Sequence, residues 1–111
     1  MDPTQKAFKI PGVQIQQLIP QMGGCFASDR IMVDGLLVGY MYRDEPYNDV
    51  DSGWRFLSGD ESQDYMDDPD HLGIYAVNTV CNYAPAIIPY LDSPPGSAFG
   101  RIGDTDKFQS E

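Results

Sequence analysis

The sequence is poor in the residues on which metal binding and nucleic-acid binding usually depend. It contains one histidine and two cysteines in 111 residues, and 7 lysines and arginines against 17 aspartates and glutamates. Structural zinc sites usually take four Cys or His ligands, and this chain has too few. The net charge of −10 argues against nucleic-acid binding, because that binding depends on cations that neutralise phosphates. No apolar run approaches the roughly 20 residues of a membrane-spanning helix, so we expect no membrane segment.

The sequence also lacks a catalytic pattern. His71 lies in a polar segment that we expect to be an exposed loop, and Cys25 and Cys81 have no local nucleophile motif, so both are expected to be small buried residues. Gly23-Gly24 lacks the spacing of a phosphate-binding loop. Asp49–Gly53 imitates the start of a calcium loop, but the glycine and the last acidic residue fall at the wrong positions. We therefore predict no catalytic residue, no metal site and no cofactor.

The first residues of the chain favour a cytoplasmic protein. Met1–Lys6 are not followed by the apolar core of a signal peptide, because Ile10-Pro11-Gly12 breaks the next stretch. Two cysteines are too few for the disulfide framework of a small secreted domain. We therefore expect a cytoplasmic location with reduced thiols.

The length of the chain suits one domain, and its short strands and helices predict an α+β fold. We expect an antiparallel sheet of about four to five strands with two to three short helices. The predicted boundaries are an N-terminal leader at residues 1–23, the α+β domain at residues 24–102, and a polar tail at residues 103–111 that should fray.

Alternating side chains and turn residues predict the strands. Asp34-Gly35 separates two alternating runs and predicts a hairpin between them. In the third strand, Trp54 and Phe56 share one face, and Arg55 and Leu57 share the other. The predicted strands span residues 25–32, 36–43, 53–58 and 98–102.

Helical spacing of apolar residues predicts two short helices, and a capping pattern predicts another. One ends near Leu18, although Pro20 opposes it. A second covers residues 61–67 on the surface, after a capping-box pattern. The third covers residues 77–84 and ends at Pro85, which also opens a turn with further inward-facing residues.

The acidic residues are concentrated in one segment. Residues 42–70 contain ten of the 17 acidic residues and two arginines, a net charge of −8. The same segment contains five aromatic residues, a composition typical of recognition surfaces. The alternative is that Trp54 and Phe56 are core, Arg55 pairs with a nearby carboxylate, and the acidic residues are a solvated face. The aromatic residues are Tyr42, Tyr47, Trp54, Phe56 and Tyr65.

Four stretches of the chain together resemble one bacterial family. They are similar to the immunity protein 33-like family, first described as domain of unknown function 2185, and the resemblance covers roughly residues 24–101. The resemblance implies a protein that neutralises a toxin of a bacterial polymorphic toxin system, and it implies no catalytic residue. The stretches are Gly39–Pro46 (GYMYRDEP), Asp51–Glu61 (DSGWRFLSGDE), Asp67–Asp70 with Gly73–Tyr75, and Ile87–Phe99 (IIPYLDSPPGSAF).

Two hypotheses follow. In the first, the protein is a non-enzymatic immunity protein that binds a basic toxin domain through an acidic, aromatic-containing face. In the second, it is a stand-alone cytosolic module that binds a small molecule, a cation or a housekeeping protein, with Trp54 and Arg55 lining a pocket that Ser93–Phe99 closes. The oligomeric state is left open. The predicted contact residues are Asp44, Glu45, Asp49, Asp51, Trp54, Arg55, Asp60, Glu61, Asp64, Asp67, Asp68 and Asp70.

Overall fold

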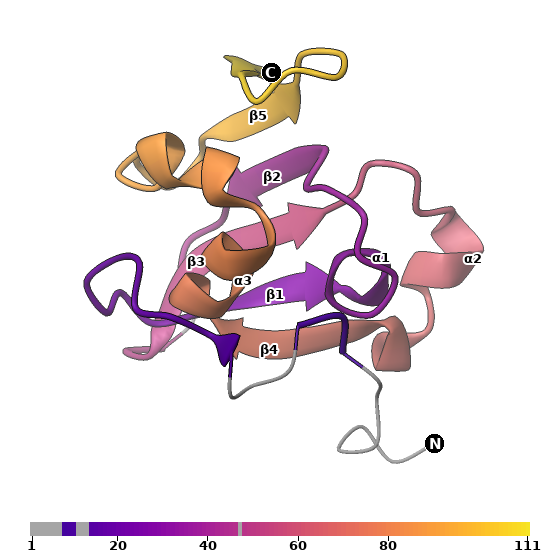
Figure 1. Ribbon diagram of the computed structural model, residues 1–111, viewed down its shortest axis with the longest axis horizontal. Helices are drawn as coiled ribbons and strands as arrows, with labels where there is room; N and C mark the ends of the chain where they lie inside the picture. Colours follow the sequence, from indigo (N-terminus) through magenta and orange to yellow (C-terminus); the bar gives the residue numbers. More distant parts are fainter. Residues whose placement is uncertain (1–7, 11–13, 47) are drawn as a thin grey trace.

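The computed structural model describes residues 8–10, 14–46 and 48–111, and its centre is a mixed sheet of six strands (Figure 1). The strand order is β4-β1-β3-β2-β5-β6. Strands β1 and β3 are parallel, and the other neighbouring pairs are antiparallel. The predicted α+β class is confirmed, but the sheet has one more strand than expected and is not purely antiparallel. The strands are β1 (Gly24–Ser28), β2 (Tyr40–Arg43), β3 (Asp51–Leu57), β4 (Leu72–Ala76), β5 (Ala98–Arg101) and β6 (Phe108–Ser110).

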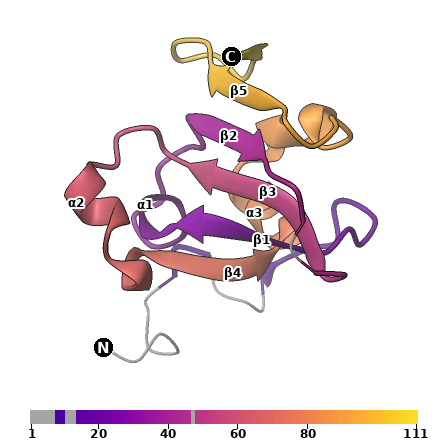
Figure 2. The same cartoon turned by 180° about the vertical axis from the view of Figure 1, so that it is seen from behind.

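Short helices cover one face of the sheet. In Figure 1, α3 lies in front of the strands, and α1 and η4 pack on the same side. Figure 2 looks onto the opposite face, where no described helix lies over β1, β2 or β3. Within the described ranges, no helix is both long and apolar enough to cross a membrane. The helices are α1 (Asp29–Met32), α2 (Gln63–Met66), α3 (Val77–Tyr83), and the 3-10 helices η3 (Pro69–His71) and η4 (Pro85–Tyr90).

The core lies between the sheet and the helices α1, α3 and η4. Trp54 and Phe56 of β3 are fully buried, and their rings stack with 5.8 Å between centroids. Val77, Val80 and Cys81 form the buried side of α3, as their spacing predicts. The predicted faces of β3 and α3 are therefore confirmed.

The turn after α3 and the surface helix after β3 are also confirmed. Pro85 ends α3 and opens η4, and both Ile87 and Leu91 are buried. Helix α2 is shorter than predicted and buries none of its side chains. It begins after Ser62, whose hydroxyl accepts a hydrogen bond from the Tyr65 N–H at 3.1 Å.

The predicted hairpin at Asp34-Gly35 is wrong. β1 runs directly into α1, so the strand predicted over residues 25–32 divides into a strand and a helix. Gly35, with φ of 79°, ends this helix: its N–H donates to the Ile31 carbonyl at 3.1 Å, and the Leu36 N–H donates to the Arg30 carbonyl at 2.9 Å. A two-residue hairpin and a helix end both favour a glycine with positive φ, so the dipeptide alone did not distinguish them.

The helix predicted near Leu18 is wrong as well. Residues 15–23 contain no helix and lie against α3, where the Oδ1 of Asn78 accepts a hydrogen bond from the Leu18 N–H at 2.7 Å. Ile19 is 9% exposed and joins the core. Pro20 has no N–H to donate to a helix, which explains the failure of the helical pattern. The remainder of the predicted leader, residues 1–7 and 11–13, lies outside the described residues.

The tail does not fray as predicted, because its end forms β6. Phe108 is 7% exposed and lies against the Tyr90 ring, with 5.3 Å between centroids. The Phe108 N–H also donates to the Tyr90 hydroxyl at 3.0 Å. One apolar residue in a polar segment thus fixes the last strand, a signal too short for a periodic pattern to detect.

We predict that Trp54→Ala strongly destabilises the protein. The indole fills the core, and its Nε1–H donates to the Leu91 carbonyl at 3.2 Å, so truncation leaves a cavity and removes this hydrogen bond. The free energy of unfolding, measured by urea denaturation, should fall by about 3–5 kcal/mol. Leu37→Ala, at a side chain that is 54% exposed, is the control and should cost less than about 0.5 kcal/mol. Equal losses in the two variants would contradict this role of Trp54.

Candidate functional site

The sheet face without helices carries a continuous row of mainly apolar side chains. Strand register places Ile74 of β4, Phe26 of β1, Arg55 of β3, Tyr42 of β2 and Ala98 of β5 side by side. With strands about 4.8 Å apart, this row is roughly 19 Å long. Figure 2 shows the strands that carry it. This surface, termed the open face, consists of Phe26, Tyr40, Tyr42, Arg55, Leu57, Ile74 and Ala98.

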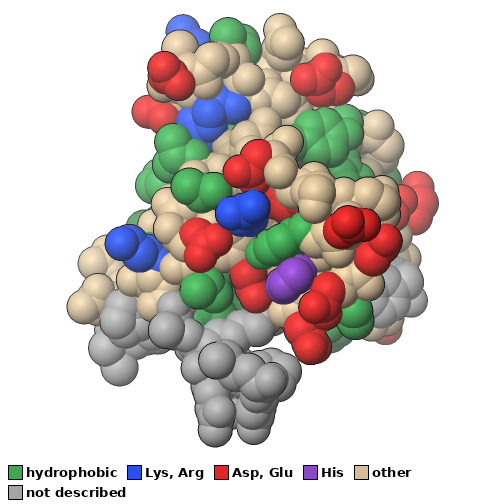
Figure 3. Space-filling view, turned by 90° about the vertical axis from the view of Figure 1, so that its right-hand side faces the viewer, with side chains coloured by type: hydrophobic (Ala, Val, Ile, Leu, Met, Phe, Trp, Pro, Cys, Tyr) green, Lys and Arg blue, Asp and Glu red, His purple; other side chains and the backbone are tan. Residues whose placement is uncertain are grey.

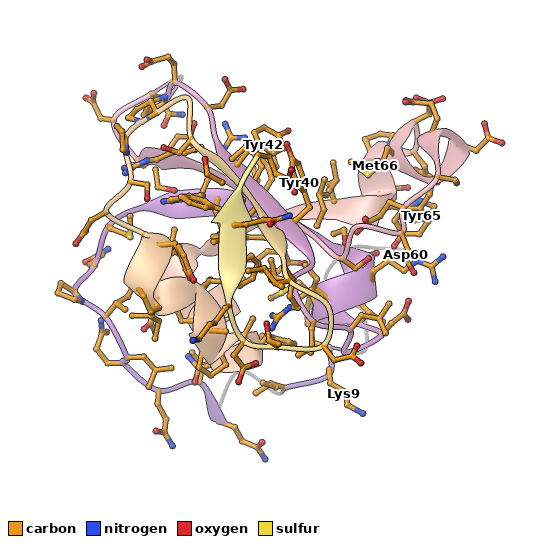
Figure 4. The ribbon with its side chains drawn as sticks, turned by 90° about the horizontal axis from the view of Figure 1, so that it is seen from above. Lys9, Tyr40, Tyr42, Asp60, Tyr65 and Met66 are labelled. Atoms are coloured by element: carbon orange, nitrogen blue, oxygen red, sulfur yellow. The ribbon has the colours of Figure 1, made fainter. Side chains whose placement is uncertain are left out.

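Two tyrosines occupy the middle of the open face. Tyr40 pairs with Leu57 and Tyr42 with Arg55, and the two tyrosine rings lie 5.9 Å apart. In Figure 4, both tyrosines lie on the side of the sheet away from α3, and Met66 of α2 lies on that same side. Tyrosine combines a large apolar ring with a hydroxyl that can remain hydrated, which suits a protein contact.

Arg55 forms the floor of the open face, and its charge is neutralised within the chain. Its guanidinium donates to the two carboxylate oxygens of Asp51 at 2.9 and 3.0 Å and to the Trp54 carbonyl at 3.0 Å. The side chains of Arg55 and Asp51 are 11% and 5% exposed. The hydrogen bonds to Asp51 raise the pKa of Arg55 above its ordinary value. The guanidinium also lies 4.6 Å from the centre of the Phe26 ring, so the ion pair supports the aromatic surface beside it.

Hollows lie on both sides of Tyr42. One has a volume of about 200 Å³ and is lined by Leu57 and by Met66 of α2. The other has a volume of about 310 Å³ and is lined by Asp44 and Ala98. Tyr42 lines both hollows, so it forms the ridge between them.

Beyond Ile74, the open face continues into a groove of about 870 Å³. Ile74 and Val50, which are 68% and 72% exposed, both line this groove. Exposed aliphatic side chains that adjoin a hollow are typical of surfaces that bind another molecule.

The acidic residues of the segment from 42 to 70 form two groups, because β3 separates them. A seven-residue strand is roughly 20 Å long, so residues before and after it lie at opposite ends of the open face. Figure 3 shows the end with α2, where acidic side chains surround the histidine. The acidic residues therefore do not form one continuous face, as predicted, but lie at the two ends of the open face, whose centre is mainly apolar. They are termed the loop group (Asp44, Glu45 and Asp49) and the helix group (Asp60, Asp64, Asp67, Asp68 and Asp70).

The predicted contact residues within β3 are not free for a partner. Trp54 is fully buried, so the alternative that it belongs to the core is the correct one. Asp51 and Arg55 bind each other, as the same alternative expected for Arg55. Tyr47, another aromatic residue of the segment, lies outside the described residues.

His71 lies in η3 and takes part in the packing of α2. Its ring stacks on Tyr65 with 3.9 Å between centroids, and its Nδ1 lies 2.8 Å from the Tyr65 carbonyl oxygen. The Arg30 guanidinium lies 5.1 Å from the centre of the Tyr65 ring and 3.8 Å from a carboxylate oxygen of Asp60. These contacts hold the helix group against the rest of the domain.

The two cysteines and the carboxylate of Asp51 in the calcium-like segment have structural roles. Cys25 and Cys81 are buried free thiols; burial raises the pKa of Cys25 and raises that of Cys81 to about 11, so both are neutral at pH 7. In the calcium-like segment, Asp51 accepts the Gly53 N–H at 3.0 Å in addition to its pairing with Arg55. Among the described residues, no three His, Cys, Asp or Glu side chains gather as a metal site would require.

The sequence patterns missed most of the open face. Phe26, Tyr40, Leu57 and Ile74 were not among the predicted contact residues. A signal exists in β2, where Tyr40 and Tyr42 flank the buried Met41, so that both faces of the strand are apolar or aromatic. Such a strand predicts either a second covering layer or a binding surface.

Glu61 connects the end of β3 to β1. Its carboxylate accepts hydrogen bonds from the Ser28 hydroxyl at 2.5 Å and from the N–H groups of Ser58 and Gly59 at 2.8 and 2.9 Å. Burial alone would raise the pKa of Glu61, but these hydrogen bonds outweigh it and the pKa is lowered. Glu61 therefore has a structural role beside the helix group.

We predict that Glu61→Gln lowers the free energy of unfolding at neutral pH. It should also make this free energy depend less on pH in the acidic range. Because the pKa of Glu61 is lowered on folding, its contribution is complete above the unfolded-state value of about 4.3 and is lost as the pH falls through the folded-state value. Urea denaturation should show that the free energy of unfolding of the variant is about 1 kcal/mol below that of wild type at pH 7. This difference should be smaller near pH 3. Asp92→Asn, at an exposed carboxylate, is the control. A gap that stays constant with pH would contradict the role of the Glu61 charge.

Comparison with known proteins identifies the domain. The family model described as the immunity protein Imm33 domain matches residues 25–110, which include nearly the whole sheet and both acidic groups. The comparisons with curated proteins and with solved structures gave no match. Since the matched segment covers most of the chain, the protein belongs to the Imm33 immunity protein domain family.

Proposed function

We propose that the protein is a bacterial immunity protein that neutralises a cognate toxin by binding it directly. The observation that carries this proposal is the match to the immunity protein Imm33 domain over residues 25–110. Inhibition by contact needs a surface complementary to the toxin and no catalytic residue of its own. The protein would act in the bacterial cytoplasm, where the toxin would otherwise reach its target.

The charge of the chain supports a basic toxin domain as the partner. The net charge is −10, and the loop group and helix group place exposed carboxylates at both ends of one sheet face. A toxin domain that acts on nucleic acid carries a basic site, which carboxylates can occupy in place of phosphates. Opposite charges also accelerate encounter between the two proteins. The acidic residues of the two groups are therefore the proposed contact residues.

The structure gives less support to a stand-alone module with a small-molecule pocket at Trp54 and Arg55. Trp54 is buried, and the Arg55 charge is occupied by Asp51. The hollow beside Arg55 has a volume of about 200 Å³, whereas small-molecule sites usually measure about 300–1,000 Å³. A protein partner, which needs a broad surface, suits this region better.

Co-expression with the toxin domain encoded by the neighbouring gene tests the proposed function. Expressed alone, that domain should stop bacterial growth, and this protein should restore growth and co-purify with it. The proposal fails if the domain is harmless alone, or if this protein neither rescues the cells nor co-purifies.

Charge removal in the helix group should slow association with that toxin domain. The double variant Asp64→Asn/Asp67→Asn removes two exposed carboxylates at the α2 end, and Asp92→Asn/Asp104→Asn removes two exposed carboxylates that belong to neither acidic group. We expect the association rate at low salt to fall about threefold to tenfold for the first variant and less than about twofold for the second. Stopped-flow measurements at several salt concentrations would show this, since the difference should vanish at high salt. Equal rates for both variants at low salt would exclude the helix group as a contact region.

A further inference from the structure

The open face differs in composition from an ordinary solvent-facing sheet surface. A sheet with one solvated face usually alternates apolar side chains toward the core with polar side chains toward water. Here Phe26, Tyr40, Tyr42, Leu57 and Ile74 all occupy the face away from the helices. At 68%, Ile74 is among the most exposed large apolar side chains of the described chain. The other four side chains are half-buried, and no described helix covers them. An apolar and aromatic sheet face of this kind indicates a contact with another molecule.

The ends of the open face carry one sign of charge. The loop group lies before β3 and the helix group after it, and the Arg55 charge between them is neutralised by Asp51. A second copy of this chain would bring acidic groups against acidic groups, which costs free energy through like-charge repulsion. A partner with basic residues complements both ends.

We propose that the open face is the docking surface for a basic protein and, resting on the proposed function, that this protein is the toxin domain. Apolar side chains of the partner pack on the ridge of Tyr42 and enter the hollows of about 200 and 310 Å³ on either side of it. Lysines or arginines of the partner meet the loop group and the helix group. The length of β3 sets these two basic clusters roughly 20 Å apart.

The arrangement agrees with the anatomy of stable protein interfaces. Such interfaces have an apolar or aromatic centre from which water is excluded and a polar rim. Tyrosine is enriched among the residues that dominate binding energy, and its side chain loses little conformational freedom on binding. The bidentate pair of Arg55 and Asp51 already fixes the floor of the site before a partner arrives, which lowers the entropic cost of association.

A pair of matched charge insertions tests the docking surface. Ile74→Arg places a cation in the open face, and Leu37→Arg places the same cation in the connection between α1 and β2. Because the two side chains are 68% and 54% exposed, both variants should fold, which thermal unfolding verifies. For binding to the toxin domain of the neighbouring gene, Ile74→Arg should raise the dissociation constant at least tenfold, and Leu37→Arg should change it less than twofold. Equal affinities overturn the docking surface and leave the proposed function intact.

If that toxin domain does not bind the wild-type protein, this result counts against the proposed function and not against the docking surface. A second probe therefore tests the docking surface without the toxin domain. A library of phage-displayed cyclic peptides is selected on the wild-type protein and then tested on Ile74→Arg, Leu37→Arg and Tyr42→Ala. The proposal expects selected peptides that combine lysine or arginine with apolar residues and that lose binding to the first and third variants only. It is overturned if no peptide is selected, if the peptides lack cationic residues, or if they bind all three variants equally.

Discussion

Strand β3 lies between β1 and β2, and its side chains alternate between the two faces of the sheet. Trp54 and Phe56 point into the core, whereas Arg55 and Leu57 belong to the open face. Because the period of a strand is two, a shift of one residue in register would bury Arg55 and expose Trp54. The same seven residues also set the distance between the two acidic groups. The core, the apolar centre of the open face and its charged ends therefore depend on one constraint, the register of β3.

The ion pair of Arg55 and Asp51 shows how a charged residue fits into this surface. A largely buried ion pair is weak evidence for stability, since desolvation of the two charges offsets much of their attraction. Its geometric effect is clearer. The pair removes a free cation from a region that would otherwise repel a basic partner, and it holds a flat guanidinium 4.6 Å from the ring of Phe26. Because Asp51 neutralises its charge, the arginine in the centre of the row adds a flat contact area to the open face and no net charge.

Local patterns predicted the elements whose signals are local. The alternation around Trp54 and the helical spacing of Val77, Val80 and Cys81 gave β3, α3 and their buried faces correctly. The parallel pairing of β1 with β3 was beyond such patterns, because it joins segments far apart in the chain. Composition located the acidic residues, but it did not show that a strand divides them. The open face was missed because alternation tells which side chains share a face and does not tell which face the helices cover.

The two parts of the surface act at different ranges and therefore on different steps of binding. Charges on the loop group and helix group act over a Debye length of about 8 Å at physiological salt, so they favour encounter with any basic protein. Such steering cannot by itself distinguish one basic partner from another. Discrimination needs contacts at close range, where the shapes of the hollows beside Tyr42 admit some side chains and exclude others. Differences in affinity between related complexes arise mainly from dissociation rates. In the proposed complex, the apolar centre of the open face would therefore set the lifetime and the specificity of binding.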